Sequence, residues 1–204
     1  MSKVVIQGNA NGTGNFTIAA PNSNTDRTFN LPDAAGTVLT TGNQSDFPAG
    51  SVLQVVNTAK TDIFSSGAAS WTEITGLNVS ITPSSTNSKI LISYNLSVTA
   101  SAAGYSAGFR LARDSTYILY GDAIGSLQQA TSYVFSDSYA YPHWHPNIIY
   151  LDSPSTTSSI TYKIYGIAPY GTSYPFYINR DRLGGTTDKF GTSVSTITAM
   201  EIAG

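Results

Sequence analysis

The 204-residue chain carries 10 Lys and Arg, 12 Asp and Glu and no cysteine, which gives a formal net charge of −2. Charged residues make up 11% of the chain, against roughly 25% in an average soluble protein, and 41% of the residues are hydrophobic, which excludes general disorder. So few basic residues cannot supply the positive field that nucleic-acid binding needs, and the lack of cysteine excludes disulfides, a thiol nucleophile and thiolate metal sites.

The N-terminal sequence MSKVVIQGNANG predicts neither a signal peptide nor a membrane anchor. It has one lysine and only a short apolar run, and nowhere in the chain do about 18 apolar residues follow one another. We therefore expect a soluble protein that is made in the cytoplasm and has no membrane partner.

Residues 1–49 differ from the rest of the chain, because short apolar pairs alternate with turn sequences such as GNANGTGN and APNSNTD. Each predicted strand is too small to be stable alone. The segment is therefore expected to pack on its own C-terminal domain, or to act as an anchoring arm on a neighbouring subunit or larger assembly. The residues predicted to anchor such an arm are Val4, Val5, Ile6, Phe16, Ile18, Phe29, Leu31, Val38 and Leu39.

Residues 50–204 are predicted to form one strand-rich domain, and Pro48 and Gly50 mark its start. The clearest strand is expected at residues 88–98, where apolar side chains occupy alternate positions and define one buried face. These are Ile90, Ile92, Tyr94, Leu96 and Val98. Further strands are expected at residues 51–57, 70–75, 77–83, 147–152, 159–167, 174–179 and 193–203.

A hairpin is expected where residues 107–113 meet residues 116–120 across an Asp114-Ser115 turn, with Arg110 and Ala112 on its solvated face. Only residues 123–130 have a composition that suits a helical turn. About eight to ten short strands with turns between them predict an all-β fold, an antiparallel β-sandwich of the jelly-roll type. We find no repeat that would build a fibre shaft.

The sequence YAYPHWHP at residues 139–146 holds both histidines and one of the two tryptophans, and it has three interpretations. In an extended segment His143 and His145 point the same way, so three chains around a three-fold axis would offer six imidazoles to an octahedral metal ion. Alternatively, the rings of Tyr139, Tyr141 and Trp144 contact a sugar or a neighbouring subunit. The segment could instead be a structural corner with a buried tryptophan and exposed histidines.

A second aromatic concentration at residues 170–177 precedes two arginines. Mixed rings and guanidinium groups suit contact with a glycan or a protein. The candidates are Tyr170, Tyr174, Tyr177, Arg180 and Arg182. In the alternative interpretation Phe176 and Ile178 face the core while the arginines pair with Asp181 and Asp188 at the surface.

The sequence predicts no enzymatic activity and no cofactor. A catalytic triad would need His143 or His145 beside a serine, with Asp137 or Asp152 to orient the ring, and no G-x-S-x-G motif is present. The acidic residues lie in or beside turn sequences, which does not favour paired catalytic carboxylates. The short glycine motifs lack the helix that a phosphate-binding loop requires.

The segment DRTFNLPDAAGTVLTTG at residues 26–42 resembles one found in tail-fibre and virion-surface proteins of tailed phages, especially those that infect cyanobacteria. Further pieces, in matching order, resemble the distal domain of such fibres. They are GSVLQVVNTAKTDIFSS (50–66), VSITPSSTNSKILISYNLSV (79–98), RLARDSTYILYGDAIGS (110–126), YLDSPSTTSSITYKIYG (150–166) and STITAMEIAG (195–204). The resemblance covers roughly residues 26–204, and it is specific as a set.

This resemblance implies a homotrimeric β-sandwich on the surface of a phage particle. Because the distal-type domain begins after only about 49 residues, with no shaft, we expect a cement or decoration protein that binds the major capsid protein on the outer capsid. The alternative is a tail-fibre or tailspike tip that recognises a host-surface polysaccharide. The resemblance implies contact with host-surface glycans or reinforcement of the shell, and the two roles can coexist.

Overall fold

The computed structural model describes residues 10–15, 17, 22, 24–26, 28, 35, 47–137, 143–182 and 191–204. The chain divides into two units, Met1–Val38 and Leu39–Gly204, and the fold given below belongs to the second unit. The nine apolar residues of the predicted arm, from Val4 to Leu39, lie outside the described residues, so the arm and its boundary at residue 49 stay predictions.

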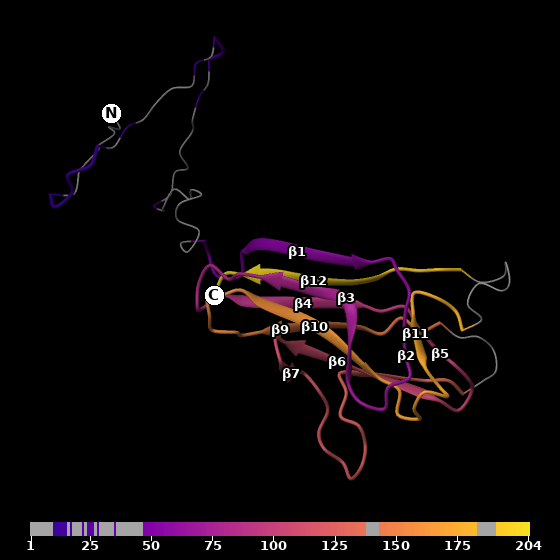
Figure 1. The fold of residues 1–204 in the computed structure, drawn as a ribbon. Helices are drawn as coiled ribbons and strands as arrows, with labels where there is room; N and C mark the ends of the chain where they lie inside the picture. Colours follow the sequence, from indigo (N-terminus) through magenta and orange to yellow (C-terminus); the bar gives the residue numbers. More distant parts are fainter. Residues whose placement is uncertain are drawn as a thin grey trace. The chain divides into compact units, whose positions relative to one another are not determined.

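The second unit is an antiparallel β-sandwich, as the sequence predicts, and its strands form three sheets (Figure 1). The four-stranded sheet has the order β1 (Val52–Lys60), β12 (Ser195–Ile202), β4 (Lys89–Asn95) and β9 (Asn147–Asp152). The five-stranded sheet has the order β3 (Thr72–Ile81), β10 (Ile160–Ile167), β6 (Ser106–Arg113) and β7 (Thr116–Ile118), and β8 (Ser132–Phe135) also pairs with β6. The third sheet has the order β2 (Phe64–Ser66), β11 (Phe176–Ile178) and β5 (Val98–Ala100).

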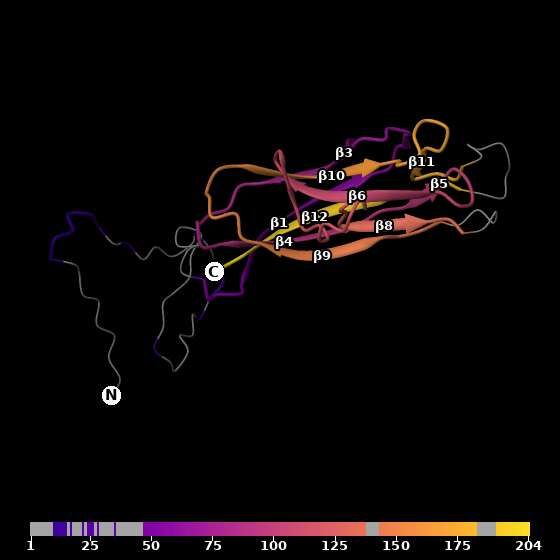
Figure 2. The same ribbon diagram turned by 90° about the horizontal axis from the view of Figure 1, so that it is seen from below.

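The core lies between the two larger sheets. Figure 2 shows β3, β10 and β6 stacked over β4, β12 and β9. Alternate residues of each strand point into this layer, because successive side chains of a strand point to opposite faces. The buried side chains include Ile90, Ile92 and Tyr94 of β4, Phe109 and Leu111 of β6, and Tyr162 and Ile164 of β10, each at most 1% exposed.

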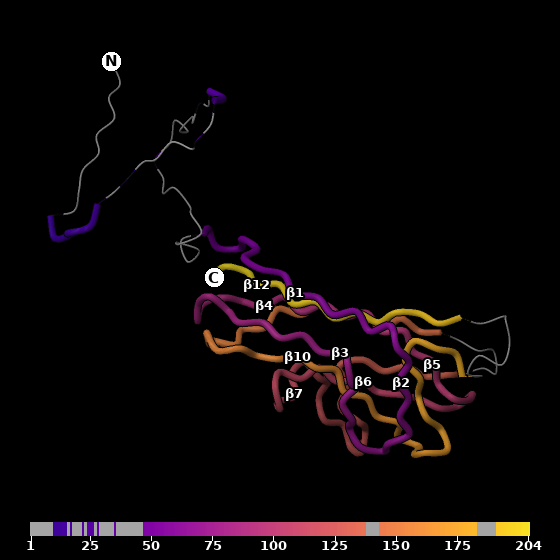
Figure 3. The backbone as a smooth tube through the Cα atoms, turned by 45° about the horizontal axis from the view of Figure 1, so that its top comes forward, coloured from indigo at the N-terminus to yellow at the C-terminus, as the bar shows by residue number. Residues whose placement is uncertain are grey.

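The predicted strand at residues 88–98 has the expected buried face, but it is divided between two sheets. β4 ends at Asn95 and β5 begins at Val98, and the two residues between them bond to a loop and to a serine side chain instead of continuing the ladder. The Leu96 N–H donates to the Pro146 carbonyl, and the Ser97 N–H donates to the Ser195 hydroxyl. The chain thereby passes from the four-stranded sheet to the small sheet, at the end of the sandwich away from the C-terminus (Figure 3).

One strand, β3 (Thr72–Ile81), lies where the sequence predicts two, at residues 70–75 and 77–83. At the predicted boundary between the two strands, β3 has a β-bulge at Gly76. The φ of Gly76, 79°, lies in the left-handed region that glycine tolerates. Opposite the bulge, the pairing of β10 with β3 shifts register between Lys163 and Tyr165. The glycine therefore bends the strand without ending it.

The prediction of a helical turn at residues 123–130 is wrong. These residues belong to a loop with a turn at Gly125-Ser126, where Gly125 has a φ of 54°. The loop is closed at its base by a hydrogen bond from the Gly121 N–H to the Ala130 carbonyl. Sequence reasoning also missed β2 and β8, which are only three and four residues long.

The hairpin of β6 and β7 is confirmed, with Arg113 opposite Thr116 across the Asp114-Ser115 turn. Asp114 has a φ of 53°, and its carboxylate accepts a hydrogen bond of 2.9 Å from the Thr161 N–H of β10. The prediction that Arg110 and Ala112 lie on a solvated face is wrong in part, because Ala112 is fully buried. Aromatic side chains cover this face, as described below.

Asn179, directly after β11, is a buried polar centre that joins three segments of the chain. Its side-chain amide donates to the carbonyls of Lys60 (2.7 Å) and Asp62 (3.0 Å), in the connection from β1 to β2. Its side-chain oxygen accepts a hydrogen bond of 2.7 Å from the hydroxyl of Ser195, where β12 begins. The residue is fully buried and has a left-handed φ of 63°.

Replacing Asn179 is expected to destabilise the sandwich strongly. Asn179→Ala should lower the free energy of unfolding by about 2–4 kcal/mol, because it removes two buried hydrogen bonds and one part-buried one. Asn179→Gly removes the same hydrogen bonds but tolerates the left-handed backbone, so it should lose about 1 kcal/mol less. Urea unfolding followed by tryptophan fluorescence measures both variants. Equal stability of Asn179→Ala and the unmodified protein would contradict this role.

Candidate functional site

Two of the predicted contact residues, Tyr170 and Tyr174, gather around a third ring, Tyr105. The Tyr105 and Tyr174 rings are stacked with centroids 3.5 Å apart, and the Tyr105 and Tyr170 rings meet edge to face at 5.0 Å. A tight turn positions them, since the Gly171 N–H donates to the Ala168 carbonyl. Tyr170 keeps 54% of its surface exposed and is therefore free to contact a ligand or partner.

Tyr170 borders a surface pocket of about 610 Å³ next to the loop at residues 119–131. Tyr133 of β8 forms another part of the wall, and the polar lining includes Asp122, Gln128 and Ser132. Rings together with amide, carboxylate and hydroxyl groups are the groups that bind a polar ligand with flat apolar faces. The pocket is therefore a candidate ligand site.

The loop that forms the pocket is held by hydrogen bonds at its base. The Thr131 hydroxyl donates to the Leu119 carbonyl and accepts from the Leu111 N–H of β6 at 3.0 Å. The Gln129 side chain donates to the Gly121 carbonyl at 2.9 Å. The pocket wall is thus fixed to the five-stranded sheet, which lowers the entropy cost of binding.

Beside the pocket, the Arg110 guanidinium lies among three aromatic rings on the outer side of the five-stranded sheet. Its distances to the ring centroids are 4.2 Å for Trp71, 4.8 Å for Tyr117 and 5.4 Å for Tyr120, all within the range of cation–π attraction. Its Nε donates to the Gln129 carbonyl at 2.5 Å, which connects this cluster to the pocket loop.

The arginine cluster continues across the sheet, because Arg110 of β6 stands opposite Tyr165 of β10. The Tyr117 and Tyr165 rings meet edge to face at 5.3 Å. Burial, and then the neighbouring Tyr165, raises the pKa of the Tyr117 hydroxyl, while Arg110 opposes this rise. Sequence reasoning missed the cluster because its members come from four separate segments. The outward position of Arg110 in a strong strand was the only local signal.

The remaining predicted contact residues lie in structural positions. The Arg180 guanidinium lies 4.2 Å from the centroid of the Tyr177 ring, and Arg182 donates to the Ser101 carbonyl at 3.0 Å. Phe176 and Ile178 face the core, as the alternative interpretation of this segment expects. Asp181 is buried rather than at the surface, and Asp188 lies outside the described residues, so the expected pairing of the arginines with these acids stays a prediction.

The tryptophan of the YAYPHWHP sequence packs against the core. Trp144 forms a bridge with Val98, in which each N–H donates to the other's carbonyl at 2.9 Å. His143 is half-buried with Nδ1 3.3 Å from the Thr99 hydroxyl, and His145 is exposed. This placement agrees most closely with the structural-corner interpretation. Tyr139 and Tyr141 lie outside the described residues, and a metal shared by three chains stays a prediction.

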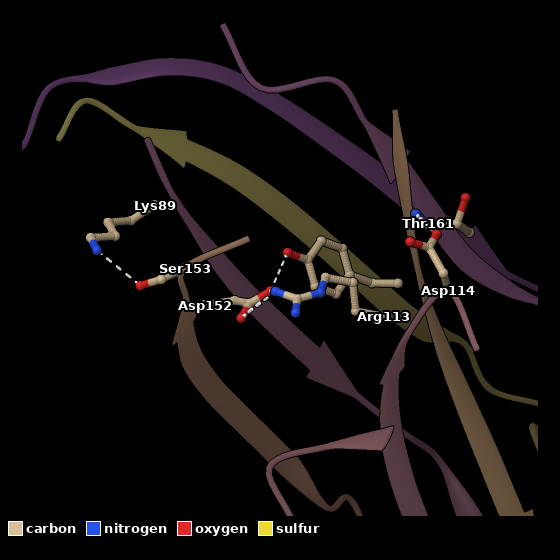
Figure 4. A network of polar contacts seen from close by, with 7 residues as sticks. Lys89, Arg113, Asp114, Asp152, Ser153 and Thr161 are labelled. Carbon is tan, nitrogen blue, oxygen red and sulfur yellow. Dashed lines mark hydrogen bonds and ion pairs between the residues drawn. The ribbon is translucent and has the colours of Figure 1, made fainter. Parts of the chain in front are cut away.

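Two buried acidic residues join strands, and Glu201, inside β12, corrects the expectation that the acids lie in or beside turns. Asp152, at the end of β9, accepts hydrogen bonds from Arg113 (2.8 and 3.0 Å) and from the Tyr162 hydroxyl (2.7 Å) (Figure 4). Burial and the bond to Asp152 raise the pKa of Tyr162, so its phenol stays protonated. The contacts link β9 of one large sheet to β6 and β10 of the other.

Glu201 of β12 is also buried, and it holds the connection between β3 and β4. One of its oxygens accepts from the hydroxyls of Ser84 and Ser88 and from the Ser84 N–H, each at 2.7 Å, and the other accepts from Gln54 at 2.6 Å. Burial alone would raise the pKa of Glu201, but these hydrogen bonds outweigh burial and leave its pKa below the ordinary value of 4.5.

No protein-family model matches the chain, and no curated protein matches it in sequence. Among the described residues, no three His, Asp or Glu side chains gather as metal ligands would. The described part of the chain also lacks any helix with the length and hydrophobicity needed to cross a bilayer.

Glu201 is expected to make the protein sensitive to acid. Because its pKa is lowered in the folded state, the unfolded chain takes up the proton first as the pH falls below about 4.5. Its contribution to stability is therefore complete above that pH and is lost as the pH falls through the folded pKa. Glu201→Gln should make the decline in stability between about pH 5 and 3 shallower, by up to about 1.4 kcal/mol per pH unit.

The matched control is Glu73→Gln, which removes a 3.1 Å ion pair with Lys163 at a partly exposed position. Urea unfolding at a series of pH values gives the slope for each variant. The assignment fails if Glu201→Gln and the unmodified protein have the same pH dependence.

Proposed function

We propose that the chain is a structural protein of a tailed-phage particle, a trimeric cement or decoration protein on the outer capsid that reinforces the shell. The residues at 26–42 and 50–204 that resemble virion-surface proteins support this proposal. The main structural support is that the buried acidic residues form hydrogen bonds between strands and loops. Asp152 and Glu201 each accept several hydrogen bonds from other strands and loops, so the groups that could do chemistry are used to make a rigid body.

In the proposed mechanism the sandwich is the rigid outer part, and residues 1–49 are the arm that binds the major capsid protein. An extended arm adds main-chain hydrogen bonds to a sheet edge or places apolar side chains in pockets between capsid subunits. Three arms on one trimer bind with a high effective concentration, so contacts that are weak singly become strong together. The partner is protein rather than nucleic acid, in keeping with the low density of basic residues.

Deleting residues 2–42 is expected to abolish capsid binding while the sandwich stays folded. Loss of the arms should weaken binding to expanded capsids by about 100-fold or more, because the multivalent contact disappears. Co-sedimentation of labelled protein with capsids that lack it measures the affinity. The truncated and full-length proteins must first show the same oligomeric mass and thermal unfolding. Equal capsid binding by the truncated protein would rule out the arm as the anchor.

A second candidate function is that of a tail-fibre or tailspike tip that binds a host-surface polysaccharide. It is favoured by one observation, the pocket between Tyr170 and Tyr133 with its polar lining. Sugar rings present the combination of flat apolar faces and hydroxyl groups that such a pocket fits. This function and the capsid role are compatible in one protein.

Tyr170→Ala tests the second candidate directly. If the pocket binds glycan, this variant should bind purified host polysaccharide about tenfold more weakly, because a stacking ring is lost. Ile63→Ala is the control, since Ile63 is similarly exposed (53%) and lies in another loop. Binding that is unchanged in Tyr170→Ala, or absent in the unmodified protein, would count against the glycan function.

A further inference from the structure

The outward face of the four-stranded sheet carries almost no charge. Its strands alternate, so that the residues opposite the core point outward from β1, β12, β4 and β9. Lys89, at one end of β4, is the only charged residue among these outward positions. The other outward side chains are apolar, Ser, Thr or Asn.

An apolar row crosses all four strands of this face. Val55 pairs with Met200, Met200 pairs with Leu91, and Leu91 pairs with Leu151. In the next row of paired residues, Ile149 of β9 pairs with Ser93 of β4. Residues that stand opposite one another on neighbouring strands have their side chains in contact on the same face, so the apolar row is a continuous stripe.

The two ends of the stripe and the neighbouring Ile149 are exposed, and its middle residues, Met200 and Leu91, are partly exposed. Ile149 is 71% exposed, Val55 is 55% exposed and Leu151 is 51% exposed. An antiparallel sheet with one face in water normally has polar residues outside, and its edge strands normally carry protective charges. The outward positions of the edge strand β9 are Asn147, Ile149 and Leu151, and none of them is charged.

The opposite side of the sandwich differs. The outer side of the five-stranded sheet carries the Lys163–Glu73 ion pair and the rings around Arg110. Those rings lie over a charged group of their own chain, while Tyr133 and Phe135 of β8 stay exposed on that sheet, at 45% and 55%. The charged groups of the five-stranded sheet distinguish its outer side from the face of β1, β12, β4 and β9.

We infer that the outward face of β1, β12, β4 and β9 is the surface through which copies of this chain associate. A second copy is the partner that this face fits, because a nearly uncharged surface can be placed against its own kind without like-charge repulsion. The inference rests on the proposed trimer for the number of copies. It names the surface that would hold the trimer together.

The size of the face also suits association between copies. Four strands about 4.8 Å apart, each with about eight residues at about 3.3 Å, present a projected area of roughly 500 Å². Side-chain relief adds to this, and a standard interface buries roughly 800 Å² on each partner. The face therefore supplies most of the area that one standard subunit contact needs.

The double variant Ile149→Asp with Leu151→Asp tests the inference. Both side chains are exposed in the single chain, so the variant should fold, but association would bury two unpaired carboxylates. Sedimentation velocity should show the unmodified full-length protein as an oligomer, and the variant at the single-chain mass of 21.5 kDa or with association weakened about a hundredfold or more.

The matched control is Ile124→Asp with Leu127→Asp. These side chains are as exposed, at 66% and 70%, but they lie in the pocket loop, so this control should stay an oligomer. Val55→Asp, on the other edge of the same face, should also weaken association. If the double variant fails to fold, this single variant provides the test. Far-UV circular dichroism verifies the fold of each variant.

Two results would overturn the inference: an unmodified protein that is a monomer, or face variants that remain folded and assemble as tightly as the unmodified protein. In the second case another surface joins the copies, and the proposed function still stands if capsid binding requires residues 2–42. A dimer that the face variants dissolve would support the inference and contradict the proposed trimer.

Discussion

The sandwich depends on burying one face of each large sheet against the other. Alternate residues of β4, β6 and β10 supply this apolar layer. A charged side chain that is buried in this layer needs hydrogen-bond or ion-pair partners, because an unpaired buried charge lowers the stability of the fold. Asp152 meets this condition with Arg113 and Tyr162, which join the two sheets, and Glu201 meets it through Gln54 and the serines before β4. The same groups that satisfy the buried charge therefore fix the positions of the strands.

The sequence predicts the strands whose pattern is local. The alternation at residues 88–98 and the apolar run at residues 147–152 are visible within a few positions, and both form strands. What it misses depends on distant pairing. β2 and β8 are too short to show a pattern, Glu201 finds Gln54 across 147 positions, and the rings around Arg110 come from strands and loops that only the fold brings together.

The candidate site is partly predictable for the same reason. Tyr170 and Tyr174 are close in sequence and were recognisable as an aromatic concentration, but Tyr105 and the pocket loop that complete the site are far from them. Trp144 also has aromatic neighbours in the sequence, but it is only partly exposed and packs against the core, as the structural-corner interpretation expects. Composition identifies candidate rings, and only the register of the strands decides which of them stay exposed.

The two outer faces of the sandwich suit different partners in the proposed particle protein. The five-stranded side carries the pocket and the rings around Arg110, and the four-stranded side carries the uncharged stripe. The most direct test of this account is a density map of the whole phage particle. The account predicts three sandwiches around each binding site on the outer capsid, with β1, β12, β4 and β9 facing neighbouring copies. Sandwiches found only at the tail, or single sandwiches with that face toward solvent, would contradict it.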